Sequence, residues 1–255
     1  MANKPPEVTA ADVAQCVARF RAARPHVHCI TNSVAQHFTA NVLLAAGATP
    51  SMTIAIEEIA DFVTMADALL INLGTMDPQR TKAIDHAVTT AESLGKPWAL
   101  DPVFVQASPI RLHLALRLLN RNPALVRCNA AEFEMLYGVS AEQMQNADSW
   151  PEATIALTGK RDVVRNREGA AHISNGSPLM DRITTMGCAL TALSVGFLAI
   201  EDDHLLAATS ALTFFALAGD HAAPRCAGPG TFVPHFLDAL ATVDESDILE
   251  GAKLA

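Results

Sequence analysis

The chain has 255 residues, half of them hydrophobic, and 27 acidic against 18 basic side chains give it a formal net charge of −9. A chain of this size buries about 70–75% of its unfolded surface, so this composition excludes a disordered, collagen-like or small disulfide-scaffold protein. An acidic chain without a basic run is also a poor partner for nucleic acid or anionic lipid, because both bind through cationic side chains.

Helical and strand-like segments alternate along the chain. Thr9 and Asp12 form a capping-box pattern that opens the first helix, Gly47 and Gly95 suit helix ends, and Pro109 suits a first turn. Helices are expected over 10–23, 34–46, 57–65, 78–94, 109–119, 130–137, 187–200, 204–222 and 232–241. Strands are expected over 27–30, 49–53, 68–73, 98–100, 125–127 and 154–157, with short antiparallel strands within 162–173. This alternation predicts an α/β fold, a mostly parallel central sheet with helices on both faces, in a single domain over residues 1–255.

The sequence shows no sign of export or of a membrane span. The longest apolar run, 189–200, is shorter than the roughly 18–20 residues that a span needs. The N-terminal residues MANKPPEVTA lack the apolar centre of a signal peptide. Five scattered cysteines without a CxxC pair indicate reduced thiols, so we expect a cytoplasmic protein.

Polar, small or acidic residues follow the predicted strands. Ligands bind at the carboxyl ends of the strands in sheets of this kind. The residues at these ends are Thr31, Asn32, Asn72, Gly74, Thr75, Asp101, Pro102, Cys128, Asn129, Thr158 and Gly159. This set suits a neutral small molecule together with a phosphate and a metal ion.

The segment 184–188 (TTMGC) is a turn that leads into an apolar helix. Unpaired backbone N–H groups at the start of a helix, here at Gly187 and Cys188, bind anions. The same field lowers the pKa of a thiol, so Cys188 is a candidate base that takes a hydroxyl proton. The alternative is a cysteine that is simply buried in the first turn of a helix.

Three charged residues follow or end predicted strands, and each allows two interpretations. Asn129 and Glu132 share one helix face and can hold Mg²⁺, directly or through water, or can form a helix capping box. Asp101 is a second acid near the metal or a turn-forming residue. Arg127, at the end of an apolar strand, reaches an ATP phosphate or makes a structural ion pair.

Other motifs favour structural roles. His26 and His28 share one strand face, but no third or fourth zinc ligand accompanies them. The segment 228–231 (GPGT) is typical of a rigid turn before a helix, and Met52 is either a core residue or a ligand contact. The chain has no Walker, GxGxxG, HExxH or GxSxG motif.

Several blocks in a fixed order carry a resemblance to a known family. They are HCITN at 28–32, FTAN at 38–41, GATPSM at 47–52, LINLGT at 70–75, DPV at 101–103, NAAE at 129–132, GC at 187–188 and GPGTF at 228–232. From about Val13 to Val243 the chain resembles the hydroxyethylthiazole kinase family of the ribokinase-like superfamily. The resemblance implies a ribokinase-like three-layer sandwich and a homotrimer with active sites between subunits. It also implies ATP- and Mg²⁺-dependent phosphorylation of 4-methyl-5-(2-hydroxyethyl)thiazole for thiamine biosynthesis.

The resemblance also assigns roles to individual residues. Cys188 matches the family's catalytic cysteine. The remaining matches are Arg127, Thr158 and Gly187 for ATP, Met52, Asn32 and Thr185 for the thiazole, and Glu132 with Asp101 for magnesium.

The chain departs from the family pattern at three loops, where Thr185, Cys128 and Phe104 stand in place of glycine or a small residue. A side chain at such a position restricts the close approach of backbone to phosphate. Two alternatives therefore stay open: a thiazole-binding protein of the same fold with little turnover, and a sister kinase for another small alcohol, such as a hydroxymethylpyrimidine.

Overall fold

A computed structural model of the protein describes residues 7–140, 142–143 and 150–255. Its eight-stranded sheet has the order β2-β1-β3-β4-β5-β6-β7-β8. The strands are β1 His26–Ile30, β2 Thr49–Ser51, β3 Ala68–Asn72, β4 Trp98–Asp101, β5 Leu125–Asn129, β6 Thr154–Thr158, β7 Asp162–Arg165 and β8 Ala170–Ile173. Neighbours from β2 to β6 pair in parallel, whereas β7 and β8 add an antiparallel hairpin. The expected mostly parallel sheet is confirmed.

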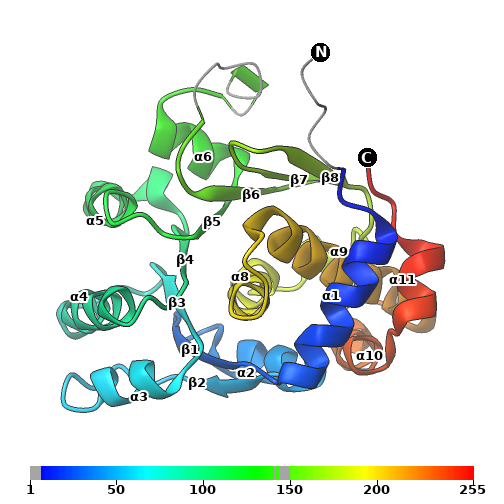
Figure 1. Cartoon of the computed structure of the whole chain (residues 1–255), viewed down its shortest axis with the longest axis horizontal. Coiled ribbons are helices and arrows are strands. Elements are labelled where there is room, and N and C mark those ends of the chain that lie inside the picture. The colour runs from blue at the N-terminus through cyan, green and yellow to red at the C-terminus, as the bar shows by residue number, and fades with distance from the viewer. Residues whose placement is uncertain (1–6, 141, 144–149) are drawn as a thin grey trace.

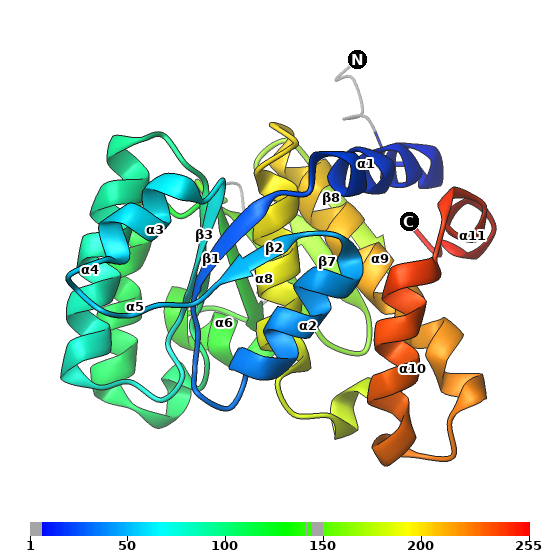
Figure 2. The same ribbon diagram turned by 90° about the horizontal axis from the view of Figure 1, so that it is seen from below.

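Helices cover both faces of the sheet (Figure 1). One layer holds α3 Ile59–Met65, α4 Pro78–Ser93, α5 Pro109–Leu119 and α6 Ala130–Tyr137. The other holds α2 Gln36–Ala46, α8 Met186–Leu198 and α9 His204–Ala222, with α1 Ala10–Ala23, α10 Pro229–Thr242 and α11 Glu245–Gly251 outside them. Figure 2 shows α1, α10 and α11 gathered at the end of the molecule away from α3, α4 and α5. The expected three-layer sandwich is therefore confirmed.

Each face of the sheet has its own apolar core. On the side of α8 and α9, the rings of Phe20 and Phe197 stack with centroids 4.2 Å apart. On the side of α4 and α5, Ile71 and Leu100 pack with Phe133. All five residues of β3 are buried, as expected of a strand that is covered on both faces.

Several element boundaries differ from the sequence prediction. The second helix begins at Gln36 and the third at Ile59, each two residues late, and the strand expected over 49–53 ends at Ser51. The turn expected at 228–231 is instead the first turn of α10, because Pro229 already has helical geometry at the first helical position. Helix α11 was not predicted.

Helix α9 corrects the expectation that no segment is long and apolar enough to cross a membrane. His204–Arg225 satisfies that criterion by length and mean hydropathy, although polar residues such as Thr209 and Thr213 interrupt its apolar run. However, 83% of its most apolar window is buried inside the protein, against α1, α8 and α10. Its apolarity is therefore explained by its position in the core.

Candidate functional site

The site lies at the carboxyl ends of the parallel strands, where side chains from three neighbouring strands form a row. Asn32 follows β1, Asn72 ends β3 and Asp101 ends β4. Asn32 Nδ2 donates to Asn72 Oδ1 at 3.1 Å, and Asn72 Nδ2 donates to Asp101 Oδ2 at 2.7 Å. Asn32 Nδ2 also donates to Cys188 Sγ at 3.3 Å. The structure thus brings Asn32, Asp101 and the half-buried Cys188 into one hydrogen-bonded network.

A positively charged group faces the start of α8. Arg127 on β5 donates from Nη2 to Thr158 Oγ1 at the end of β6. Its guanidinium also lies against Gly187, since a Cβ at that glycine would sit only 2.4 Å from Arg127 Nη1. The guanidinium of Arg127, the hydroxyl of Thr158 and the N-terminus of α8 thus lie together, and groups of these kinds bind phosphate.

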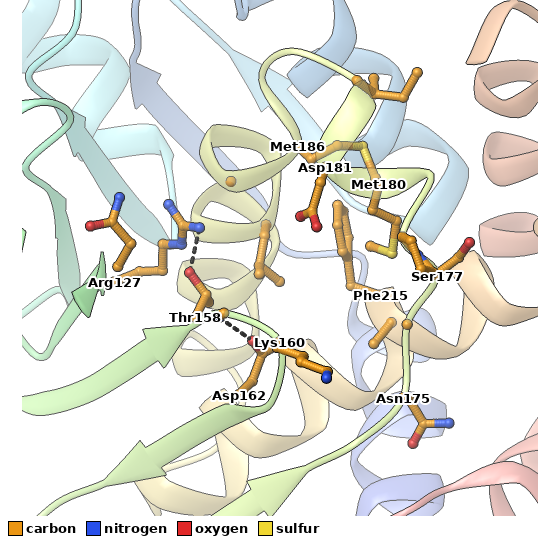
Figure 3. Close-up of a pocket in the computed structure, with 18 of the residues that line it drawn as sticks. Arg127, Thr158, Lys160, Asp162, Asn175, Ser177, Met180, Asp181, Met186 and Phe215 are labelled. Atoms are coloured by element: carbon orange, nitrogen blue, oxygen red, sulfur yellow. Dashed lines mark hydrogen bonds between the residues drawn. The ribbon is translucent and has the colours of Figure 1, made fainter. Parts of the chain in front are cut away.

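A cavity of about 820 Å³ opens beside this cation. In Figure 3, Arg127, Thr158 and Lys160 lie along one side of it and Asp181 and Met186 along the other. The remaining lining residues are Asn129, Gly159, Asp162, Asn175, Gly176, Ser177, Pro178, Met180, Ile183, Thr185, Gly187, Leu190, Phe215 and Ala216. The volume suits a nucleotide-sized ligand, because binding pockets for small molecules measure about 300–1,000 Å³.

The cavity takes in four of the nine residues predicted for the site, namely Arg127, Thr158, Gly187 and Thr185. Asn32, Asp101 and Cys188 belong to the hydrogen-bonded row. Glu132 on α6 is bonded to Asn129, which lines the cavity. Met52 lies apart from this cavity, partly buried against the apolar core of the α8 side.

Sequence reasoning missed Lys160 and Asp162, which also line the cavity. Burial raises the pKa of Asp162 to about 6, although the backbone N–H of Gly159 donates to its Oδ1 at 2.9 Å. Their position just after Thr158 and Gly159, at a strand end, was the signal that could have identified them.

We expect Gly187→Ala to raise the KM for ATP by several-fold, because the new methyl group displaces the Arg127 guanidinium from the helix start. A net hydrogen bond of about 1 kcal/mol corresponds to a factor of about five. Gly230→Ala is a matched control: Gly230 is likewise the second residue of a helix, and its added Cβ meets open space. Steady-state kinetics at varied ATP measure both variants, and an unchanged KM for Gly187→Ala would contradict this role for Arg127.

Thr185 precedes α8 with φ +74°, in the left-handed region that favours glycine. Its side chain makes no capping hydrogen bond and lines the cavity. A β-branched residue is strained in this conformation. The backbone therefore keeps the shape of a glycine turn, while a hydroxyl has been added at the cavity wall.

We expect Thr185→Gly to lower kcat/KM by up to about tenfold, because a hydrogen bond from the hydroxyl to the phosphate or the alcohol is lost. The same change should raise the melting temperature, since glycine adopts this φ without strain. Kinetics and thermal unfolding of one variant separate the two effects. A clear gain in kcat/KM would mean that the side chain merely obstructs the loop.

Two buried acids, Asp101 at the end of β4 and Glu132 in the first turn of α6, lie near the carboxyl ends of the strands. Asp101 is fully buried, and its Oδ1 has no hydrogen-bond partner in the described part of the chain, whereas Thr191 Oγ1 and Asn72 both donate to Oδ2. Burial raises the pKa of Asp101 to about 6, and Arg127 opposes that rise. An unpartnered carboxylate oxygen is a group that Mg²⁺ prefers, so Asp101 fits a metal ligand.

Glu132 serves as a structural cap as well as an acid. Asn129 and Glu132 form the capping box of α6, with 2.9 Å bonds in both directions. Glu132 Oε1 also accepts the N–H of Phe104 at 2.8 Å. The capping interpretation is thus confirmed, and Glu132 additionally fixes the 103–104 turn, where Phe104 has φ +57°. Because a carboxylate offers about four lone-pair sites, both oxygens can still accept a water-mediated metal contact.

The expected lowering of the Cys188 pKa is wrong. Burial, followed by the charge of Asp101, raises the pKa of this thiol to about 12, although the hydrogen bond from Asn32 acts in the opposite direction. The helix N-terminus alone had suggested the lowered value. Asn32 and Asp101, which act on the thiol, come from segments far away in the chain, so the local sequence could not show them.

The paired histidines are structural. His28 Nδ1 and His26 Nε2 each lie 2.8 Å from Ser51 Oγ, which ties β1 to β2, and burial lowers the pKa of His28 to about 4. Within the residues that the structure describes, no three His, Cys, Asp or Glu side chains gather as a metal site.

Comparison with known proteins places these features in a family. The model of the hydroxyethylthiazole kinase family matches residues 17–246. The chain is 42% identical to a probable hydroxyethylthiazole kinase of Agrobacterium fabrum, over 96% of each chain. It is 40% identical to the hydroxyethylthiazole kinase of Pectobacterium atrosepticum, over 97% of this chain and all of the relative.

Solved structures are similar to this chain in the same way. The hydroxyethylthiazole kinase protein of Pyrococcus horikoshii superposes with a TM-score of 0.90 at 35% identity, over 95% of this chain and 98% of that one. Pyridoxal kinase of Staphylococcus aureus, at 16% identity and a TM-score of 0.60, covers 76% of this chain and 88% of its own and shares the fold alone. The chain belongs to the hydroxyethylthiazole kinase family.

Proposed function

We propose that this protein transfers the γ-phosphoryl group of ATP to the hydroxyl of 4-methyl-5-(2-hydroxyethyl)thiazole, giving the phosphate used in thiamine biosynthesis. Membership of the family supports the reaction. The observation that carries the proposal is that Arg127, Thr158 and the start of α8 lie together in the lining of a cavity of about 820 Å³.

The residues divide into a nucleotide side and an alcohol side. Arg127 and Thr158 bind phosphate oxygens, and the N–H groups of Gly187 and Cys188 stabilise the charge on the phosphoryl group in flight. Phosphoryl transfer depends mainly on positioning and electrostatics, so it does not require a strong base.

On the alcohol side, Asn32, Met52 and Thr185 contact the thiazole alcohol in this proposal. Cys188 lies close to its hydroxyl and assists the loss of the proton. The thiol also remains hydrogen-bonded to Asn32.

Asp101 and Glu132 would hold Mg²⁺ beside the triphosphate. The unpartnered Oδ1 of the fully buried Asp101 supports this assignment. Asp101 at the end of β4 and Glu132 in the first turn of α6 would supply the carboxylates for an ion that neutralises phosphate charge.

A second candidate function is thiazole binding with little turnover. The left-handed backbone at Thr185 and Phe104 favours it, because both positions carry side chains where the backbone geometry suits glycine. An ADP-release assay with the thiazole alcohol and, separately, a hydroxymethylpyrimidine distinguishes the candidates. ADP release with the thiazole alone supports the proposal. Release with the pyrimidine alone indicates the sister activity, and thiazole binding without release indicates the binding protein.

We further infer a single-domain cytoplasmic protein that forms a homotrimer with active sites between subunits. Val34 and Leu44, beside and on α2, are 61% and 58% exposed and support burial against a second copy of the chain. Light scattering is expected to give three times the 27.0 kDa chain mass. A monomer mass at micromolar concentration would contradict both the trimer and a shared site.

A further inference from the structure

Asn72 is the buried centre of the row of polar side chains. The sequence places it at a strand end but gives it no role of its own. It pairs directly with Asp101 in the register of β3 and β4, and it is fully buried. Its Oδ1 accepts two hydrogen bonds, from Gly74 N at 3.0 Å and from Asn32 Nδ2 at 3.1 Å. Its Nδ2 donates to Asp101 Oδ2 at 2.7 Å.

Backbone groups fix the orientation of both amides in the row. The N–H of Gly74 can only donate, so the Asn72 atom facing it must be oxygen, and the N–H of Ala35 fixes Asn32 Oδ1 in the same way, at 3.0 Å. Each Nδ2 group is therefore directed onward, from Asn72 to Asp101 and from Asn32 to Asn72 and Cys188.

Close packing holds this arrangement in place. A Cβ at Gly74 would lie 2.7 Å from Asn32 Cβ and 3.0 Å from its Nδ2, so the backbone after β3 is pressed against the Asn32 side chain. The link to the thiol runs through Asn32, which donates from Nδ2 both to Asn72 Oδ1 at 3.1 Å and to Cys188 Sγ at 3.3 Å. Asn72 is thus linked to the acid on one side and to the thiol on the other.

We propose that Asn72 is a positioning residue that sets the distance between the alcohol side of the site, Asn32 with Cys188, and the acid Asp101 on the metal side. The inference rests on the proposed function, because it uses the roles given there to Cys188 and Asp101. In-line transfer requires the alcohol oxygen and the phosphorus to be held in register, and a displacement of about 1 Å costs about 10²-fold in rate.

A double-mutant cycle tests this coupling. Asn72→Ala is expected to lower kcat by about 10- to 100-fold with a much smaller change in the KM for ATP. If Asn72 acts through the thiol, the double variant should have a kcat only slightly lower than that of Cys188→Ala alone, because the interaction that Asn72 supports is already lost. Thr191→Val is the matched control. Thr191 also donates to Asp101 Oδ2, at 3.2 Å, but it has no hydrogen bond to Asn32 or Cys188 in the described ranges. The loss of kcat caused by Thr191→Val should therefore be the same in wild type and in Cys188→Ala, so that the two losses multiply in the double variant.

Two results would overturn the inference. One is a wild-type kcat for Asn72→Ala. The other is a double variant whose loss of kcat equals the product of the losses in Asn72→Ala and Cys188→Ala. Thermal unfolding checks each variant, and Asn72→Ser replaces Asn72→Ala in the cycle if the alanine variant does not fold. Failure of both to fold would make Asn72 purely structural and would also overturn it. The proposed function fails separately, if the wild-type protein releases no ADP with the thiazole alcohol.

Discussion

Replacing Cys188 by alanine is expected to lower kcat by roughly 10-fold to 10³-fold, at or below the usual range for general-base assistance, and to leave the thiazole affinity largely unchanged. The Sγ atom accepts the amide N–H of Asn32 and lies in the first turn of α8. Alanine removes both this anchor and the proton acceptor. Steady-state kinetics at varied thiazole alcohol measure the two parameters separately.

The raised pKa of Cys188 gives this prediction a pH dependence. A thiol with a pKa of about 12 is almost wholly protonated at neutral pH, so its thiolate fraction grows about tenfold per pH unit from pH 7 to pH 9. If the thiolate takes the proton, the ratio of wild-type to Cys188→Ala kcat should rise over this range. Cys226→Ala is the control, because its half-buried thiol lies outside the site and bonds the carbonyl of Ala223. A wild-type kcat for Cys188→Ala would remove its catalytic role.

Glu132→Gln is expected to weaken the use of Mg·ATP by about 10- to 100-fold, the usual cost of losing a group that supports a metal site. Thiazole binding should change far less. The amide keeps the shape of the side chain but loses the charge that a divalent ion favours, and its NH₂ group cannot accept one of the two backbone N–H bonds, from Phe104 and Asn129. Kinetics over a series of Mg²⁺ concentrations at fixed ATP measure the effect.

Glu134→Gln provides the matched control, because Glu134 is exposed on the same helix. It should behave as wild type in both Mg²⁺ dependence and melting temperature. If added Mg²⁺ changes the rates of wild type and Glu132→Gln by the same factor, Glu132 acts only as a helix cap, and a lowered melting temperature would then be its whole effect.

Local signals predicted much of the fold. The capping box at Thr9 and the left-handed Gly47 mark helix ends as expected, and α1 has the predicted bounds. Helix α11 begins with the same kind of signal, a capping box between Asp244 and Asp247. Helix ends can be predicted from the sequence because the residues that form a cap lie within a few positions of one another.

The site was predictable only in part, because its decisive contacts join distant segments. Their places at strand ends identified Asn32 and Asp101, but the hydrogen bonds that join both residues to Asn72 depend on how β1, β3 and β4 are ordered in the sheet. The burial that reverses the expected shift at Cys188 has the same origin. Likewise, the left-handed backbone at Phe104 is fixed by a carboxylate 28 positions away in the chain.

The edge strand β2 is poorly suited to accept a further strand. It has only three residues, and Thr49 directs its N–H inward, to the carbonyl of Pro25 at 2.9 Å. Successive backbone N–H groups point to opposite sides of a strand, so the next residue, Pro50, occupies the position whose N–H would face outward, and proline has none. This edge therefore offers no amide donor to a neighbouring molecule, which guards against fibrous aggregation. Copies that meet here must associate through side chains such as Leu44 instead of extending the sheet from one molecule into the next.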